Sequence, residues 1–169
     1  MVGDEFSEDE VTKPCLASPR KWTFVVKMKP IGKARAKPRV RMKKKGRAGP
    51  AYKIWHQTPQ KTVDGEEFIR MIAREAGVQM IHGPVGMRVL ALFPTNVSDT
   101  KKQKAEKLAG GAWHMQKPDR DNVEKLVMDA LSGIAYPDDC RSPHGTVTKR
   151  WVDRDLSEGS LTITIWELL

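Results

Sequence analysis

The chain has 169 residues, of which 39% are hydrophobic, and its formal net charge at pH 7 is +9. This length suits one domain with its own core, since most domains contain roughly 100–150 residues. The charge favours a polyanionic partner, nucleic acid first, because phosphates attract lysine and arginine and release counterions on contact. No apolar run approaches the roughly 20 residues of a membrane span, and the acidic start of the chain does not resemble a secretory signal.

The cysteines, Cys15 and Cys140, form no C-x-x-C pair and match no zinc-site spacing. We interpret them as unpaired thiols in a reducing cytoplasm. Any bound metal is therefore expected to be a hard cation with oxygen ligands, and we expect no small-molecule cofactor.

Residues 1–20 mix acidic residues with prolines and serines and show no hydrophobic period, which predicts a flexible tail before a domain over residues 21–169. From Trp22 to Met28, apolar and polar residues alternate. This period of two predicts a strand that ends at Pro30.

The most basic stretch follows, over residues 33–50, and glycines and prolines bracket it, which predicts a loop or mobile arm. Its basic residues are not interrupted by an acidic one, which favours phosphate contact, although a charge run can equally be a solvated surface. The candidate DNA-binding residues are Lys33, Arg35, Lys37, Arg39, Arg41, Lys43, Lys44 and Lys45. Tyr52 and Trp55 are interpreted as core or rim residues rather than as platforms for stacked bases.

Two elements are expected between residues 64 and 93. Asp64 and Glu67 fit a capping box and Gly77 fits a stop, which predicts a helix over residues 64–76. Its apolar face would carry Phe68, Met71, Ile72 and Ala76. The apolar run within residues 85–93 predicts a strand covered on both faces.

Residues 95–116 are polar and are expected to be irregular, apart from a short helix around residues 101–108. His56 and His114 are interpreted as ordinary polar residues. A second main helix is predicted from Asp121 to about Gly133, because its apolar residues recur at helical spacing. These are Val123, Leu126, Val127, Ala130 and Leu131, with Ile134 just past the end.

Two strands, over residues 146–152 and 160–168, would complete the chain, with Gly159 in the turn between them. The expected fold class is α+β, a single small domain with a mixed sheet and packed helices.

Acidic residues gather at the start of the second main helix. In extended backbone, Asp119 and Asp121 would share a face, and Lys125 lies one helical turn after Asp121. Asp129 could flank the same lysine. Such a group can hold Mg²⁺ and stabilise charge on a phosphate. The alternative needs no chemistry: Asp121 caps the helix, Glu124 completes the cap and Lys125 forms a salt bridge.

Asp138 and Asp139 follow this helix. A helix of about a dozen residues is roughly 18 Å long, so a short link cannot return them to its start. A cluster of three carboxylates therefore requires that the chain turns back at this pair or that another strand intervenes.

These residues resemble the RusA family of Holliday-junction resolvases, which are endodeoxyribonucleases of bacteria and phages. The shared pattern is D-x-D-N at residues 119–122, then Lys125, D-A-L at 129–131 and D-D at 138–139. The resemblance extends over about residues 22–168 and includes the basic stretch and the basic-aromatic run at 149–151. It departs after Asp139, where Pro143 and Gly145 are expected to delay or bulge the next strand.

The resemblance implies that Asp119, Asp121, Lys125 and Asp139 are catalytic, and that the three aspartates bind Mg²⁺, with Mn²⁺ as a substitute. It also implies a homodimer, RusA-like in fold, that resolves four-way DNA junctions by symmetric paired nicks during recombination and repair. The expected location is the cytoplasm of a bacterial or phage-infected host cell. A two-fold junction suits an isologous dimer with one site per subunit.

Two alternatives remain open from the sequence. One is a non-catalytic module that binds branched DNA, and the other is a nuclease for another nucleic-acid structure, such as flaps or RNA. The complete acidic set argues against the first alternative, because carboxylates that face phosphates bring no advantage to a pure binding protein.

Overall fold

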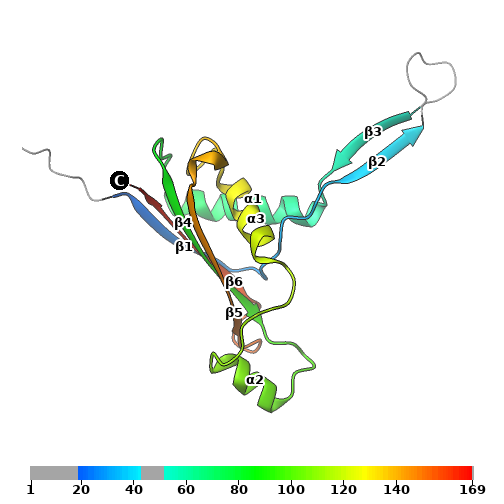
Figure 1. Ribbon diagram of the computed structural model, residues 1–169, viewed down its shortest axis with the longest axis vertical. Coiled ribbons are helices and arrows are strands. Elements are labelled where there is room, and N and C mark those ends of the chain that lie inside the picture. Colours follow the sequence, from blue (N-terminus) through cyan, green and yellow to red (C-terminus); the bar gives the residue numbers. More distant parts are fainter. Residues whose placement is uncertain (1–18, 43–51, 169) are drawn as a thin grey trace, which may run out of the picture.

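The computed structural model describes residues 19–42 and 52–168. A four-stranded sheet has the order β1-β6-β4-β5. Strands β4 and β5 are parallel, while the β1–β6 and β6–β4 pairs are antiparallel. The strands are β1 (Lys21–Val26), β4 (Val85–Pro94), β5 (His144–Val152) and β6 (Ser160–Glu167). Helices α1 (Gln60–Glu75) and α3 (Arg120–Leu131) pack against this sheet and against each other (Figure 1). The expected α+β domain with a mixed sheet is therefore confirmed.

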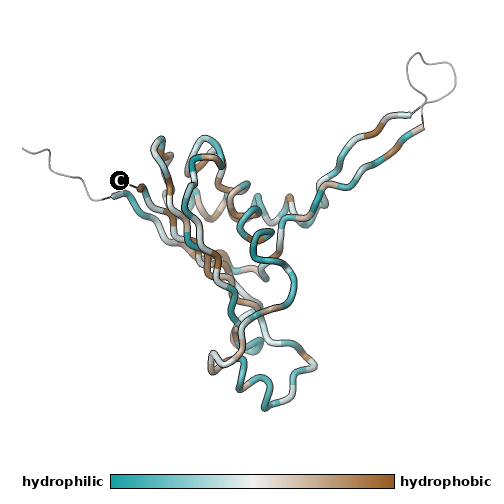
Figure 2. The backbone as a smooth tube through the Cα atoms, viewed as in Figure 1, coloured by the Kyte–Doolittle hydropathy of each residue, from teal (hydrophilic) through white to brown (hydrophobic). Residues whose placement is uncertain are grey.

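The core lies between the helices and one face of the sheet. On β4, Val85, Met87, Val89, Ala91 and Phe93 are buried. Arg88 is exposed, and the leucines between the buried positions are only half-buried. The expectation that both faces of this strand are covered was wrong, because β4 is central in the sheet but the helices pack on one face alone. Figure 2, coloured by residue hydropathy, shows hydrophobic residues gathered along the central part of the sheet.

The two C-terminal strands are confirmed, and β5 begins two residues earlier than expected. Its first residue, His144, directly follows Pro143, and its pairing with β4 runs without a bulge to Val152. Gly145 lies inside the strand, where an added Cβ atom would lie too close to a Glu124 carboxylate oxygen of α3, so a larger residue would require this side chain to move. The departure from the family pattern therefore leaves the strand regular.

Helix α1 begins four residues before the expected start. Its N-cap is Pro59, and Asp64 instead accepts a hydrogen bond of 2.8 Å from Gln60 within the first turns. Gly77, with φ of +70°, follows the end of the helix as expected. The buried face was also misplaced: it is centred on Ile69 and Ala73, and Phe68 and Ile72 pack only at its border. Met71 is exposed.

The other helices match the sequence pattern. All five apolar residues of the α3 stripe are fully buried, and Gly133, with φ of +78°, follows the helix. Helix α2 (Lys101–Leu108) occupies the expected range and begins with a capping box between Thr100 and Gln103. Within the described residues, we find no helix that is long and apolar enough to cross a membrane.

The basic stretch is not simply a loop. Strands β2 (Lys37–Met42) and β3 (Tyr52–Gln57) form an antiparallel hairpin that projects from the body of the molecule, here called the arm (Figure 1). The prediction of a loop was wrong here because the basic residues hid a period of two, in which Val40 and Met42 alternate with arginines. Tyr52 and Trp55 lie exposed on the arm, not in the core or its rim.

Candidate active site

The N-terminal end of α3 presents two exposed carboxylates. Asp119, not Asp121, is the N-cap residue, and its backbone is extended while its side chain forms no capping hydrogen bond. Asp121 already lies in the first helical turn, where its side chain accepts a long hydrogen bond of 3.5 Å from Asn122. The sequence suggested that extended backbone would place both side chains on one face. Only Asp119 has extended backbone, so this alignment is not present.

Lys125, one turn further along α3, is exposed. Within the described part of the chain, neither this lysine nor Asp119 or Asp121 forms a salt bridge. The alternative of a cap with a supporting salt bridge is therefore not what the structure contains. Asp121, in the first turn of the helix, still interacts favourably with the helix dipole.

Lys149 of β5 positions the backbone that leads into Asp119. Its Nζ atom donates hydrogen bonds to the carbonyl oxygens of Gln116 (2.6 Å) and Pro118 (2.7 Å). Burial lowers the pKa of Lys149, and the charge of Asp119 opposes this effect. Sequence reasoning noted the basic-aromatic run at 149–151 but could not assign this role, since the pairing depends on where β5 lies beside α3.

His114 lies behind this loop and was wrongly treated as an ordinary polar residue. It is 6% exposed and stacks on Phe93, with ring centroids 3.8 Å apart, while Trp151 flanks it at 4.4 Å. Burial, together with the nearby charges of Lys149 and Lys107, lowers the pKa of His114 to about 4. The residue is therefore neutral at pH 7 and supports the aromatic packing beside the site.

Lys33 differs from the other basic candidates because carboxylates surround it. Its Nζ atom lies 2.5 Å from Glu66 of α1 and 2.6 Å from Asp129 of α3, and its backbone N–H donates to the carbonyl of Asn122. Burial tends to lower the pKa of Lys33, but the hydrogen bonds with Asp129 and Glu66 raise it above its ordinary value. Asp129 therefore pairs with Lys33, not with Lys125, and this lysine joins α1 to α3.

The structure describes four of the remaining DNA-binding candidates and does not describe the other three. Arg35, Lys37, Arg39 and Arg41 are exposed on the arm or on the segment that leads to it. Lys43, Lys44 and Lys45 lie outside the described residues.

Asp139 lies at the opposite end of α3. It begins the short 3-10 helix η1 (Asp139–Arg141), just after Tyr136, whose hydroxyl donates to the carbonyl of Met128 near the C-terminal end of α3. A hydrogen bond with Asp138 raises the pKa of Asp139, with smaller contributions from burial and from the charges of Asp138 and Asp129. The chain returns towards Asp119 only along β5, which begins after this pair.

The described residues of one chain therefore contain no cluster of three metal-binding side chains. The three-carboxylate group that the resemblance implied is not formed within a single chain, because α3 separates Asp139 from Asp119 and Asp121. The N-terminal pair still fits Mg²⁺, which is commonly held by one or two carboxylates together with waters and substrate phosphate. Both carboxylates are exposed, and neither forms a salt bridge within the described chain.

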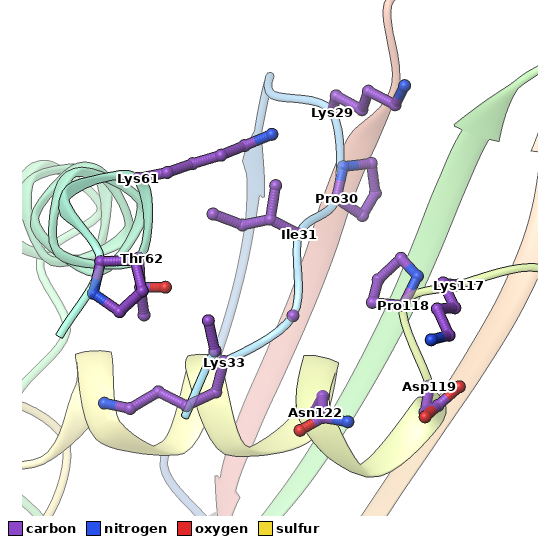
Figure 3. A pocket seen from close by; sticks show the side chains of 13 residues that line it. Lys29, Pro30, Ile31, Lys33, Lys61, Thr62, Lys117, Pro118, Asp119 and Asn122 are labelled. Atoms are coloured by element: carbon purple, nitrogen blue, oxygen red, sulfur yellow. The ribbon is translucent and has the colours of Figure 1, made fainter. Parts of the chain in front are cut away.

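A groove opens beside Asp119, between the N-terminal ends of α1 and α3 (Figure 3). Its volume is about 640 Å³, and the connecting segment after β1 forms its floor. Lys29, Lys61 and Lys117 line it together with Asp119. Lys29 and Lys61 were not singled out from the sequence, because they are far from Asp119 along the chain, whereas Lys117 lies two residues before it.

Comparison with known proteins adds two findings. Residues 28–159 match the family model described as "Endodeoxyribonuclease RusA", a range that includes both ends of α3, the arm and the groove. The curated "Uncharacterized protein YqaN" of Bacillus subtilis (strain 168) is 33% identical over 90 residues. That alignment covers 52% of this chain and 63% of the length of the relative.

Proposed function

Because this chain belongs to the RusA family of endodeoxyribonucleases, we propose that it cuts branched DNA and resolves four-way junctions by symmetric paired nicks. The observation that carries this proposal is the pair Asp119 and Asp121, which are exposed at one helix end without a capping bond or a salt bridge to the described chain. In a protein with a net charge of +9, unpartnered carboxylates of this kind suit a metal ion better than a structural role.

In this proposal, Asp119 and Asp121 hold Mg²⁺, which Mn²⁺ can replace. When bound, the metal supplies an activated water and neutralises charge on the scissile phosphate. Lys125, exposed one turn after Asp121, stabilises negative charge that develops on the phosphate. Lys149 keeps the backbone before Asp119 in place through its two carbonyl contacts.

The arm binds the DNA backbone in this proposal. Its exposed Lys37, Arg39 and Arg41 lie at alternate positions of β2 and so point to one face of the hairpin. A row of cations on a projecting hairpin can follow phosphates without reading bases, as structure-selective binding requires. The contacts proposed for Lys43, Lys44 and Lys45 rest on the sequence alone, because these residues lie outside the described structure.

We further propose that Asp139 reaches the metal site from a second copy of the chain. Within one chain, α3 keeps Asp139 away from Asp119. A two-fold axis that passes beside the middle of α3, perpendicular to the helix, would bring each Asp139 towards the N-terminal end of the partner's α3. This arrangement would give two equivalent sites for two symmetric cuts.

Mixed dimers test the placement of Asp139. If Asp139 acts in the partner's site, mixing inactive Asp119→Asn and Asp139→Asn proteins should restore one working site per mixed dimer. If it acts in its own chain, both sites of the mixed dimer carry a substitution and cutting stays absent. Recovery of single nicks on a labelled junction distinguishes these results. The two variants carry different affinity tags, so that purification through both tags verifies that mixed dimers form.

The function itself is tested with an end-labelled synthetic four-way junction, incubated with the purified protein in Mg²⁺ and in EDTA. We expect symmetric nicks that require Mg²⁺ and disappear in Asp119→Asn. Tight junction binding without nicks in Mg²⁺ or Mn²⁺ would instead support the binding module. Faster cutting of a flap or an RNA in competition would reassign the substrate.

A further inference from the structure

We propose that the groove beside Asp119 holds the sugar-phosphate backbone of the DNA strand next to the bond that is cut. This inference rests on the proposed nuclease function and names a binding site for that activity. The groove residues are separate from the arm, so the strand would have two areas of contact, one on the arm and one beside the carboxylates.

The floor of the groove is held in place by close packing. A side chain on Gly32 would place its Cβ atom 2.8 Å from Pro118 and 2.9 Å from Asn122. A side chain on Gly65 of α1 would likewise meet Ile31, at 2.6 Å. Since glycine at both positions allows the segment to lie tightly between α1 and α3, the groove is formed before any ligand arrives.

The charge of the groove favours a polyanion. Lys29, Lys61 and Lys117 are exposed, and none forms a salt bridge with a described residue. Figure 3 shows Lys61 extending from α1 over Ile31 and Lys117 lying beside Asp119. The one carboxylate in the lining is Asp119 itself. Three lysines from separate segments therefore face a common space that ends at a proposed catalytic residue.

Lys61 is placed where a lysine does not help the fold. It lies in the first turn of α1, which has no acidic residue there and no side-chain cap on its first N–H groups. A cation at the positive end of a helix dipole is unfavourable, so the residue fits this position better as a ligand for an anion than as a stabiliser of α1.

The size and floor of the groove indicate which part of DNA it accepts. Its volume of about 640 Å³ is within the usual range of ligand pockets. Pro30, Ile31 and Pro118 provide apolar contacts for a sugar or a base face, while the lysines provide contacts for phosphates. A strand that crosses the groove would bring its next phosphate to Asp119.

The first test compares Lys61→Glu and Lys29→Glu with Lys101→Glu, which makes the same charge change on α2 outside the groove. In an Asp121→Asn background, DNA binding can be followed by fluorescence anisotropy without cutting. We expect each groove variant to weaken junction binding about tenfold, beyond any effect of Lys101→Glu. The salt dependence of binding should indicate that about one fewer counterion is released. Lys61→Glu should keep or raise the melting temperature, so lost binding would not reflect unfolding.

The second test locates the strand. In a Cys15→Ser, Cys140→Ser background, Lys61→Cys is labelled with a short photocrosslinker and irradiated with the junction. We expect crosslinks to the nucleotides next to the nick. Crosslinks only to distant arms of the junction would overturn the inference, as would groove variants that bind like Lys101→Glu.

These outcomes distinguish a failure of the proposed nuclease function from a failure of the groove inference. If the wild-type chain neither binds nor cuts branched DNA, the proposed function itself fails. If it cuts but the groove variants match the control, this inference alone fails. A free nucleotide is the other source of the same phosphate chemistry: weakened binding of deoxynucleoside monophosphate, with unchanged binding of a strand, would also overturn the inference.

Discussion

The two ends of α3 carry the same kind of residue under opposite conditions. At the N-terminal end, Asp119 and Asp121 are exposed, and neither forms a salt bridge within the described chain. Towards the C-terminal end, Asp129 pairs with Lys33, which also pairs with Glu66. Carboxylates that neighbours neutralise stabilise the fold, while carboxylates without partners are available for a metal or a substrate. The difference teaches that the partners of an aspartate, more than its presence in a motif, indicate its role.

The largest expected effect is on the nicking rate, when the N-terminal end of α3 loses a carboxylate. Asp121→Asn should lower the nicking rate by about 10²–10³-fold, because the proposed metal ion loses one of its two carboxylate ligands and with it the charge stabilisation at the phosphate. The free energy of unfolding should change by less than about 0.5 kcal/mol, since the residue is exposed. Nicking assays and urea denaturation measure the two quantities.

Asp129→Asn is the matched substitution at the other end. It should leave the nicking rate near that of the wild type and lower the free energy of unfolding by about 1 kcal/mol, because Lys33 loses one of its carboxylates. A large loss of nicking by Asp129→Asn with stability unchanged would contradict the comparison.

The next effect concerns pH and the aromatic packing beside Asp119. The pKa of His114 is lowered from 6.5 to about 4, so between these values the unfolded chain binds a proton that the folded chain does not. Stability should therefore fall as the pH decreases through this window, by about 2 kcal/mol once solvent screening is allowed for.

His114→Phe can retain the stacking on Phe93 while it removes the titration. Because carboxylates also titrate at low pH, the measurement is the difference in unfolding free energy between the wild type and this variant at several pH values. A difference that stays constant from pH 7 to pH 4 would show that protonation of His114 does not control this packing.

A smaller effect distinguishes Lys33 from the arm. Lys33→Ala should lower the free energy of unfolding by about 1–2 kcal/mol, because Glu66 and Asp129 would face each other without their shared cation. The estimate is modest because the lysine side chain is 24% exposed, so water screens the pair.

Arg39→Ala is the control for Lys33→Ala. It lies exposed on β2, so it should leave stability unchanged and reduce the salt dependence of junction binding by about one ion. If both variants weakened binding equally at unchanged stability, Lys33 would belong with the DNA contacts after all.

Local patterns were sufficient for much of the fold. The apolar stripe of α3, the capping box of α2 and the alternation in β1 each depend on residues a few positions apart, and all three elements are present. Helix α1 shows the limit of local patterns. The sequence predicted that the helix begins at a cap formed by Asp64, but it begins directly after Pro59. The arm shows the same limit, because a run of charge masked the strand period of β2.

The acidic motif could be found in the sequence because its residues are close together along the chain. By itself, the sequence determined most of the helices and the strands of the main sheet, together with the identity of the acidic residues, since these depend on local spacing. Only the tertiary structure decided which charges are neutralised, that α3 separates Asp139 from Asp119, and that Lys29, Lys61 and Lys117 line one groove. These relations arise from the packing of distant segments, which the spacing of residues along the chain does not encode.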